Sequence, residues 1–389
     1  MNDIALKYYL CPLARQCAEY DKMAVTEHFY IKASEGVRLT PAEALILWGE
    51  APLSMLMYLA DHRRRSIHKG DVVGWMIDRN INITNICFSQ CRFCNFCRTS
   101  KSDEAYVTTD AEYDRKIGEL VALGGDQLLL QGGMNPALDL AYYVSLFGGL
   151  KKRWPAIKLH ALGPPEVVYL ARKEKMSYRE VLVALHDAGL DSLPGAGAEI
   201  LVDRVREIVS PAKATAEEWL GVMREAHKLN LPTSATMMFG HAETVAERIE
   251  HLVRLRDLQD EKPDGHDGFI TFIPWPFMDR GTPLAEKYGI RSNVTAAEYL
   301  KIIAISRLVL DNIPNIQSSI LTVGAETAMI SLHAGANDLG SVMIEENVVS
   351  AAGDPFRTSP EEMKQIITEA GFTPVRRDQR YRPYVPAGN

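Results

Sequence analysis

The sequence predicts an α/β protein whose parallel strands close into a (β/α)8 barrel. Short apolar runs recur along the chain, and segments with helical periodicity separate them. Strands that alternate with helices form a parallel sheet, and eight such units fit about 250 residues. The chain has 389 residues. We therefore expect an N-terminal helical extension at residues 1–70, the barrel at residues 71–340 and a C-terminal helical extension at residues 341–389.

Five segments have clear strand character, because they are rich in β-branched or large apolar residues and most end at Gly or Pro. They are residues 81–86, 127–130, 157–162, 234–238 and 269–273. Weaker candidates bring the number to the eight that a barrel needs, and they are residues 191–193, 316–317 and 336–338.

Helix starts are marked by a capping box, in which Ser or Thr is followed three residues later by Glu and the two side chains satisfy exposed backbone N–H groups. Six such pairs are Thr40/Glu43, Thr109/Glu112, Ser177/Glu180, Thr215/Glu218, Thr295/Glu298 and Ser359/Glu362. An apolar stripe from Leu140 to Leu150 predicts a further helix. Gly148 and Gly149 weaken its C-terminal end, since each costs about 1 kcal/mol relative to Ala.

Composition excludes several classes of protein. The formal charge of −7 argues against a surface that binds nucleic acid or an anionic membrane. No apolar run reaches the length of a membrane span, and the first residues lack the pattern of a secretory signal. Six cysteines are too few for a disulfide framework in a chain of this length. We therefore expect a cytoplasmic protein with no nucleic-acid or membrane partner.

Four of the six cysteines lie between positions 87 and 97, directly after a predicted strand. Cys87, Cys91 and Cys94 have the spacing CxxxCxxC. Three thiolates can bind three irons of a 4Fe–4S cluster and leave the fourth iron open, whereas electron-transfer clusters use four. An open iron can chelate the amine and carboxylate of S-adenosylmethionine (SAM), and electron transfer then releases a 5′-deoxyadenosyl radical.

Other interpretations of the cysteines stay open at this point. A zinc site prefers four ligands, often as separated CxxC pairs. A four-cysteine cluster could use Cys97, which also has ligand spacing from Cys94, and would make the chain an electron carrier. Buried structural thiols are a third possibility.

Six segments resemble the radical SAM superfamily and, within it, the menaquinone-biosynthesis enzymes of the futalosine pathway. They are residues 78–87, 131–133, 193–201, 235–241, 272–275 and 335–347, and the resemblance extends from about residue 35 to about residue 382. It implies a radical SAM barrel, a 4Fe–4S cluster, SAM, a small-molecule substrate and a flavodoxin or ferredoxin as electron donor.

The activity that the resemblance implies most closely is the cyclisation of dehypoxanthine futalosine to cyclic dehypoxanthinyl futalosine. The siblings, aminofutalosine synthase and the deazaflavin-cofactor synthase, are the alternatives. Two positions depart from the pattern of these relatives. Cys97 stands where they usually have another residue, and Asn135 stands where they usually have His.

The resemblance also assigns roles to individual residues. It implies Cys87, Cys91 and Cys94 as cluster ligands. Seven positions are expected to bind the cofactor, namely Gln131, Gly132, Gly133, Glu199, Arg206, Thr236 and Trp275. Three residues are expected as acceptors of the proton that the reaction releases, namely His241, Asp338 and Glu345.

Overall fold

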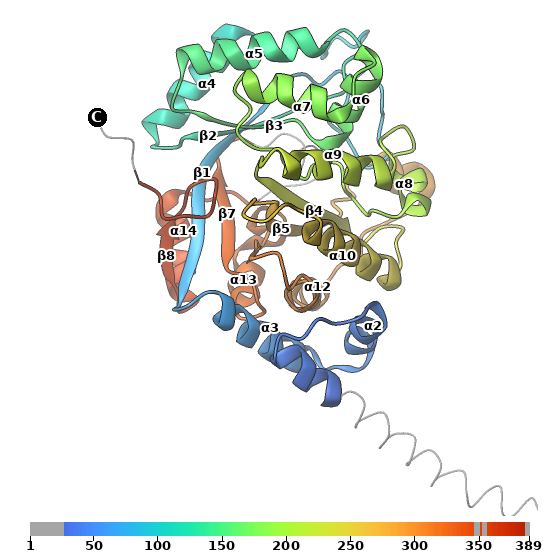
Figure 1. The fold of residues 1–389 in the computed structure, drawn as a ribbon, viewed down its shortest axis with the longest axis vertical. Helices are drawn as coiled ribbons and strands as arrows, with labels where there is room; N and C mark the ends of the chain where they lie inside the picture. The colour runs from blue at the N-terminus through green and yellow to red at the C-terminus, as the bar shows by residue number, and fades with distance from the viewer. Residues whose placement is uncertain (1–26, 346–350, 352–355, 386–389) are drawn as a thin grey trace, which may run out of the picture.

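The computed structural model describes residues 27–345, 351 and 356–385. Two helices, α2 (Pro41–Glu50) and α3 (Leu53–Ile67), precede the first strand and lie at one end of the molecule (Figure 1). The capping box of Thr40 and Glu43 starts α2 as expected. In the part of the N-terminal extension that the structure describes, the chain is therefore helical, and α3 packs against helix α12.

The strands form two parallel sheets. The first sheet has the order β3-β2-β1-β7, and the second has the order β4-β5-β6. Their bounds are β1 Val72–Asn82, β2 Gln127–Gln131, β3 Lys158–Ala161, β4 Thr233–Phe239, β5 Phe269–Pro276, β6 Asn315–Ile316 and β7 Asp338–Met343.

Single parallel bridges join the two sheets into a closed barrel. Ser192 pairs with β3 and Leu193 pairs with β4, so the short segment 192–193 takes the place of a strand between them. On the other side, Gln317 pairs with Asp338 at the start of β7. Within the described residues, β1 to β7 and the segment 192–193 therefore fill the eight strand positions around the barrel. The predicted barrel is confirmed.

Helices cover the outside of the barrel (Figure 1). The predicted capping boxes are present at the starts of α4, α7, α9 and α14, and Thr295 caps α12. α5 continues through Gly148 and Gly149 to Arg153. The bounds are α4 Asp110–Ala122, α5 Leu140–Arg153, α6 Pro164–Glu174, α7 Tyr178–Asp187, α8 Asp203–Val209, α9 Ala216–Lys228, α10 Val245–Asp260, α11 Pro283–Tyr288, α12 Ala296–Val309, α13 Ile320–Leu332 and α14 Pro360–Glu369.

The core lies between the strands and the helices, and the strand period of two determines which side chains enter it. On β1, Ile77 and Ile81 face outward, are at most 4% exposed and belong to this core. Alternate residues of the same strand face the interior of the barrel. The barrel interior is therefore lined by a different and more polar set of side chains.

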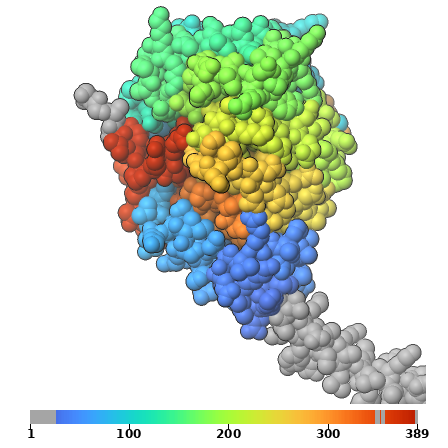
Figure 2. Space-filling model, viewed as in Figure 1, coloured from blue at the N-terminus to red at the C-terminus, as the bar shows by residue number. Residues whose placement is uncertain are grey.

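The floor of the barrel is built by a strand that follows α14. β8 (Thr373–Arg376) pairs in parallel with the first half of β1, on the edge that β2 occupies further along. Next to it, the Arg377 guanidinium forms an ion pair with Asp338, at 2.5 Å between Nε and Oδ2. Figure 1 shows β8 beside β1, and Figure 2 shows the C-terminal segment in red on the surface. The expected C-terminal extension is thus a helix followed by a strand.

Two sequence-based boundaries differ from the structure. The first strand was expected at residues 81–86, but β1 begins at Val72 and ends at Asn82. The chain leaves the ladder there because Thr84 and Asn85 bond to loop carbonyls of Tyr106 and Glu104 instead. The last barrel strand was expected at residues 336–338, where β7 only begins.

Candidate active site

A cavity of about 400 Å³ occupies the interior of the barrel. Every second residue of β1 lines it: Met76, Asp78, Asn80 and Asn82. The cysteine loop covers the end of the barrel at which β1 terminates, which is where barrel enzymes keep their active sites. This volume is within the range of small-molecule sites.

The cysteine loop follows β1 and places Cys87, Cys91 and Cys94 on the cavity wall. Cys97 also lines the cavity, and its thiol bonds the carbonyl of Cys94 at 3.8 Å. Phe93 is on the wall as well and gives the cysteines an apolar neighbour. Three thiols in one short loop, at the edge of a cavity, fit the donor set of a 4Fe–4S cluster with one open iron.

Gly133 allows the loop after β2 to approach the cysteines. Its N–H donates to the carbonyl of Thr84 at 2.8 Å. A Cβ added to Gly133 would press on the carbonyl of Ile86 and lie 2.8 Å from the Cβ of Cys87. The glycine is needed at this position because backbone lies against backbone, not because of a positive φ. Gln131 and Gly132 line the cavity beside it, so the three expected positions lie together at the cysteine loop.

Among the described residues, no group of three or more His, Cys, Asp and Glu side chains is spaced to hold a single metal ion. A zinc ion would need sulfur ligands at about 2.3 Å from one point.

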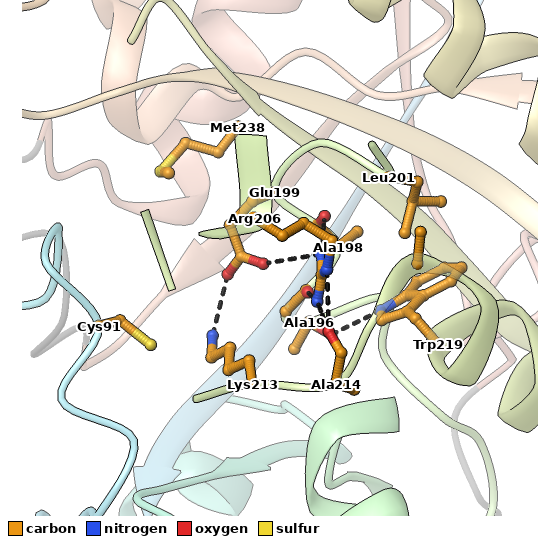
Figure 3. A network of polar contacts seen from close by, with 12 residues as sticks. Cys91, Ala196, Ala198, Glu199, Leu201, Arg206, Lys213, Ala214, Trp219 and Met238 are labelled. Carbon is orange, nitrogen blue, oxygen red and sulfur yellow. Dashed lines mark hydrogen bonds and ion pairs between the residues drawn. The ribbon is translucent and has the colours of Figure 1, made fainter. Parts of the chain in front are cut away.

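Glu199 and Lys213 form the charged wall of the cavity opposite Cys91 (Figure 3). The Lys213 ammonium donates to Glu199 Oε1 at 2.9 Å, and it lies 5.2 Å from the ring centre of Phe93. Burial favours the neutral amine, but the charges of Cys91 and Glu199 outweigh it and raise the pKa of Lys213 above its usual value. Glu199 has a φ of 41°, a strained value for a residue with a side chain and one that clusters at functional sites.

Arg206 does not face the cavity, although it was expected to bind the cofactor. Its guanidinium donates to the carbonyls of Gly197, Ala198 and Ala214 at 2.6–3.1 Å, and it is 3.5 Å from Glu199. Figure 3 shows it beside Ala198 and Ala214. Arg206 thus holds the loop that carries Glu199, and of the two cations beside Glu199 it is Lys213 that faces the cavity.

Sequence reasoning missed Lys213. It lies in a loop, two residues before the capping Thr215, and no motif spacing marks it. Thr236 and Trp275, both expected at the cofactor, do line the cavity, and the Thr236 hydroxyl donates to the carbonyl of Gly195 at 2.6 Å. Asn135 is buried outside the cavity, and its side-chain oxygen accepts from the N–H of Ala137.

The three expected proton acceptors do not line the cavity. His241 is fully buried, and its ring nitrogens bond the carbonyl of Met238 and the N–H of Ala242. Asp338 is fully buried against Arg377.

Glu345 forms ion pairs with Arg79 at 3.0 Å and Lys116 at 2.6 Å, on the side of β1 that faces α4. The segment there is not helical at Glu345, and Glu346 lies outside the described residues. None of the three expected acceptors is therefore brought to the cavity.

Two further carboxyl groups and one imidazole line the cavity away from the Glu199 pair, on Asp78, Glu166 and His160. Burial raises the pKa of Asp78 to about 6 and that of Glu166 to about 7. Burial lowers the pKa of His160 to about 3, so this imidazole is neutral at physiological pH. Near pH 7, Glu166 is the lumen-facing carboxyl whose pKa best suits proton transfer.

Comparisons with known proteins agree with this geometry. Residues 81–255 match the family model for the radical SAM superfamily, and residues 266–387 match the CofH/MqnC C-terminal region. A cyclic dehypoxanthine futalosine synthase from Streptomyces coelicolor is 42% identical over 91% of this chain and 88% of its own length. The chain belongs to the radical SAM superfamily. Members of this superfamily use a 4Fe–4S cluster and SAM.

Further relatives belong to the same group. A cyclic dehypoxanthine futalosine synthase from Halalkalibacterium halodurans is 41% identical over 90% of this chain and 92% of its own length. An aminodeoxyfutalosine synthase from Thermus thermophilus is 38% identical over 90% of this chain and 94% of its own length. Among solved structures, methylornithine synthase has a TM-score of 0.67 at 20% identity and covers 90% of this chain and 97% of its own, a likeness of fold.

Among the described residues, none of the helices is both long and apolar enough to cross a membrane.

Proposed function

We propose that this protein converts dehypoxanthine futalosine to cyclic dehypoxanthinyl futalosine in menaquinone biosynthesis. The observation that carries the proposal is its 42% and 41% identity, over about nine tenths of the chain, to two synthases of that name. The cavity inside the barrel, below the cysteine loop, supports it, because a carbon radical needs a site away from bulk water and from other hydrogen donors.

Cys87, Cys91 and Cys94 would hold the cluster, and Glu199 with Lys213 would hold the charged methionine part of SAM. Together, the cluster and SAM supply a 5′-deoxyadenosyl radical. In the proposed reaction the C4′–H bond of the substrate's ribose breaks and its hydrogen ends in 5′-deoxyadenosine. C4′ then bonds to the substrate's own benzoate ring. The ring would then lose a proton and one electron, and the electron would pass to the cluster held by Cys87, Cys91 and Cys94 or to an external one-electron acceptor.

Glu166 is our candidate for the acceptor of that proton. It lies at the start of α6, and its Oε2 accepts from the N–H of Gly163 at 3.1 Å. Its cavity-facing position and its pKa of about 7 support the assignment over His241, Asp338 and Glu345. A Glu166→Gln variant should form 5′-deoxyadenosine while losing much of the cyclised product. Unchanged product yield would remove Glu166 from this role.

The reaction also needs one electron from outside, and we propose a flavodoxin or ferredoxin as its source in the cytoplasm. Reduction by a purified flavodoxin with its reductase, in place of dithionite, tests this partner. No turnover with the flavodoxin system or with a reduced ferredoxin, while dithionite sustains turnover, would argue against this partner.

The substrate assignment is tested by following the fate of deuterium. The reconstituted enzyme is incubated without oxygen with SAM, reductant and dehypoxanthine futalosine carrying deuterium at ribose C4′. We expect 5′-deoxyadenosine with one deuterium and a product lighter than the labelled substrate by one deuterium and one hydrogen. Aminodeoxyfutalosine synthase would instead leave the adenosyl group bonded into the product. That result would replace the cyclase proposal by the sibling activity.

A further inference from the structure

Three polar side chains of the neighbouring strands β1 and β2 line the barrel cavity. Asp78 and Asn80 are successive inward-facing residues of β1, and Gln127 is the register partner of Asp78 on β2. All three line the cavity, and Asn80 is 2% exposed while Asp78 and Gln127 are 5% exposed. They are therefore buried by the barrel wall and open only to the cavity.

Hydrogen bonds within the group leave acceptor atoms without donors. Ser341 donates to Asp78 Oδ1 at 2.5 Å, and Gln127 Nε2 donates to Asp78 Oδ2 at 3.4 Å. The second bond fixes the Gln127 amide with its oxygen turned away from the carboxylate. Gln127 Oε1 and Asn80 Oδ1 have no hydrogen-bond partner although both are buried. Buried polar atoms almost always have a hydrogen-bond partner. Two acceptor oxygens without one, both on the same cavity, therefore point to a ligand that supplies the donors.

The chemistry of the group identifies that ligand. Neutral amide oxygens accept well from neutral hydroxyls, and the Asp78 carboxylate retains unused lone pairs for a further donor. Strand geometry places Asp78 and Asn80 about 7–13 Å along β1 from its end at Asn82. That depth puts them below the cysteine loop, where a molecule attacked by a cofactor-derived radical must lie. A ligand with neighbouring hydroxyls, such as a sugar, matches both the acceptors and the depth.

We propose that Asp78, Asn80 and Gln127 form a hydroxyl-binding subsite that holds the sugar of the substrate. The inference rests on the proposed function, in which a ribose carries the abstracted hydrogen. Ribose hydroxyls donate to Asn80 Oδ1, Gln127 Oε1 and the Asp78 carboxylate, which orients C4′ toward the cofactor end of the cavity. A substrate without a sugar leaves these acceptors unpaired, so the subsite selects for hydroxylated substrates.

The test measures dissociation constants for the cluster-loaded enzyme with SAM and no reductant, so that nothing turns over. Dehypoxanthine futalosine is compared with its 2′-deoxy and 3′-deoxy analogues. Asn80→Ala and Gln127→Met should each weaken binding of the full substrate by about 3- to 10-fold, the effect of one neutral hydrogen bond. Each should have no effect on the analogue that lacks its own hydroxyl partner. Leu129→Met, the control that lines the same cavity from β2, should affect all three ligands equally.

Equal losses for the substrate and both analogues in Asn80→Ala and Gln127→Met would overturn the subsite. Iron content, melting temperature and SAM affinity show whether Asn80→Ala or Gln127→Met has failed to fold. If one of them has, the binding data of the other variant decide whether the subsite exists. If the wild type ignores dehypoxanthine futalosine but binds 5-amino-6-(D-ribitylamino)uracil, with the same loss in Asn80→Ala, the subsite stands and the proposed function falls. If the wild type binds neither hydroxylated ligand, both proposals are overturned.

Discussion

Arg206 and Lys213 are both cations beside Glu199, but we expect their replacement by Met to affect different properties. Arg206→Met should lower the stability of the fold, whereas Lys213→Met should lower the affinity for SAM. Arg206→Met removes the donors to the carbonyls of Gly197, Ala198 and Ala214. Each buried carbonyl left unpaired costs about 1–3 kcal/mol, and breaking a buried ion pair costs about 3–5 kcal/mol. The carbonyls lie in the two segments that flank α8, and both segments can relax once the guanidinium is gone, so we expect a total near 3–5 kcal/mol rather than the sum of all the separate costs. The melting temperature should then fall by roughly 10 °C.

Lys213→Met leaves that loop in place, because Arg206 keeps its bonds. It removes the cation that faces the cavity, so SAM affinity should fall by about 10- to 100-fold, the effect of a hydrogen bond to a charged group. Calorimetric titration of the cluster-loaded enzyme with SAM measures this loss, and differential scanning calorimetry measures the melting temperature. Arg206→Met with unchanged melting temperature and lost SAM affinity would show that Arg206, not Lys213, contacts the cofactor.

Three further predictions concern the cysteine loop and the core. Cys97→Ala should keep the iron content of the wild type while Cys91→Ala loses the cluster, and equal loss of iron in both would mean that Cys97 is a ligand. Gly133→Ala should reduce cluster incorporation, measured as iron per chain, because its Cβ has no space beside Cys87. Burial lowers the pKa of His227 to about 3 in the folded protein. As the pH falls below about 6.5, the imidazole is therefore protonated in the unfolded chain but not in the folded one, and this favours unfolding. His227 should therefore cost about 2 kcal/mol of stability at pH 5 relative to pH 8, and a His227→Gln variant with the same pH dependence as the wild type would contradict this.

Local signals in the sequence predicted most of the scaffold. A capping box needs only two residues three apart, so the starts of α2 and α4 could be read directly. The spacing of Cys87, Cys91 and Cys94 carries its chemistry within eight residues, and the structure brings all three to one cavity wall. The helix starts were confirmed because each capping interaction spans less than one helical turn, and the three cysteines lie together because they occupy one short loop.

The sequence could not place side chains whose surroundings are formed by residues far away in the chain. Nothing near Arg206 in the sequence indicates that carbonyls at positions 197, 198 and 214 will surround its side chain. Asp338 was expected at a strand end facing the active site, but it begins β7. Its carboxylate accepts a hydrogen bond from Arg377, which comes 39 residues later in the chain. Glu166 and Lys213 were overlooked because each faces the cavity only once the barrel has closed.

The pairing of β8 with β1 has a consequence for the order of folding. The two strands are separated by about 300 residues, so their contact carries a high loop-closure cost and forms late. During synthesis, the first half of β1 presents an unpaired edge until β8 has emerged. An exposed strand edge is a template for pairing with other chains. A nascent chain halted before residue 373 should therefore aggregate through β1 even though most of its barrel is already made.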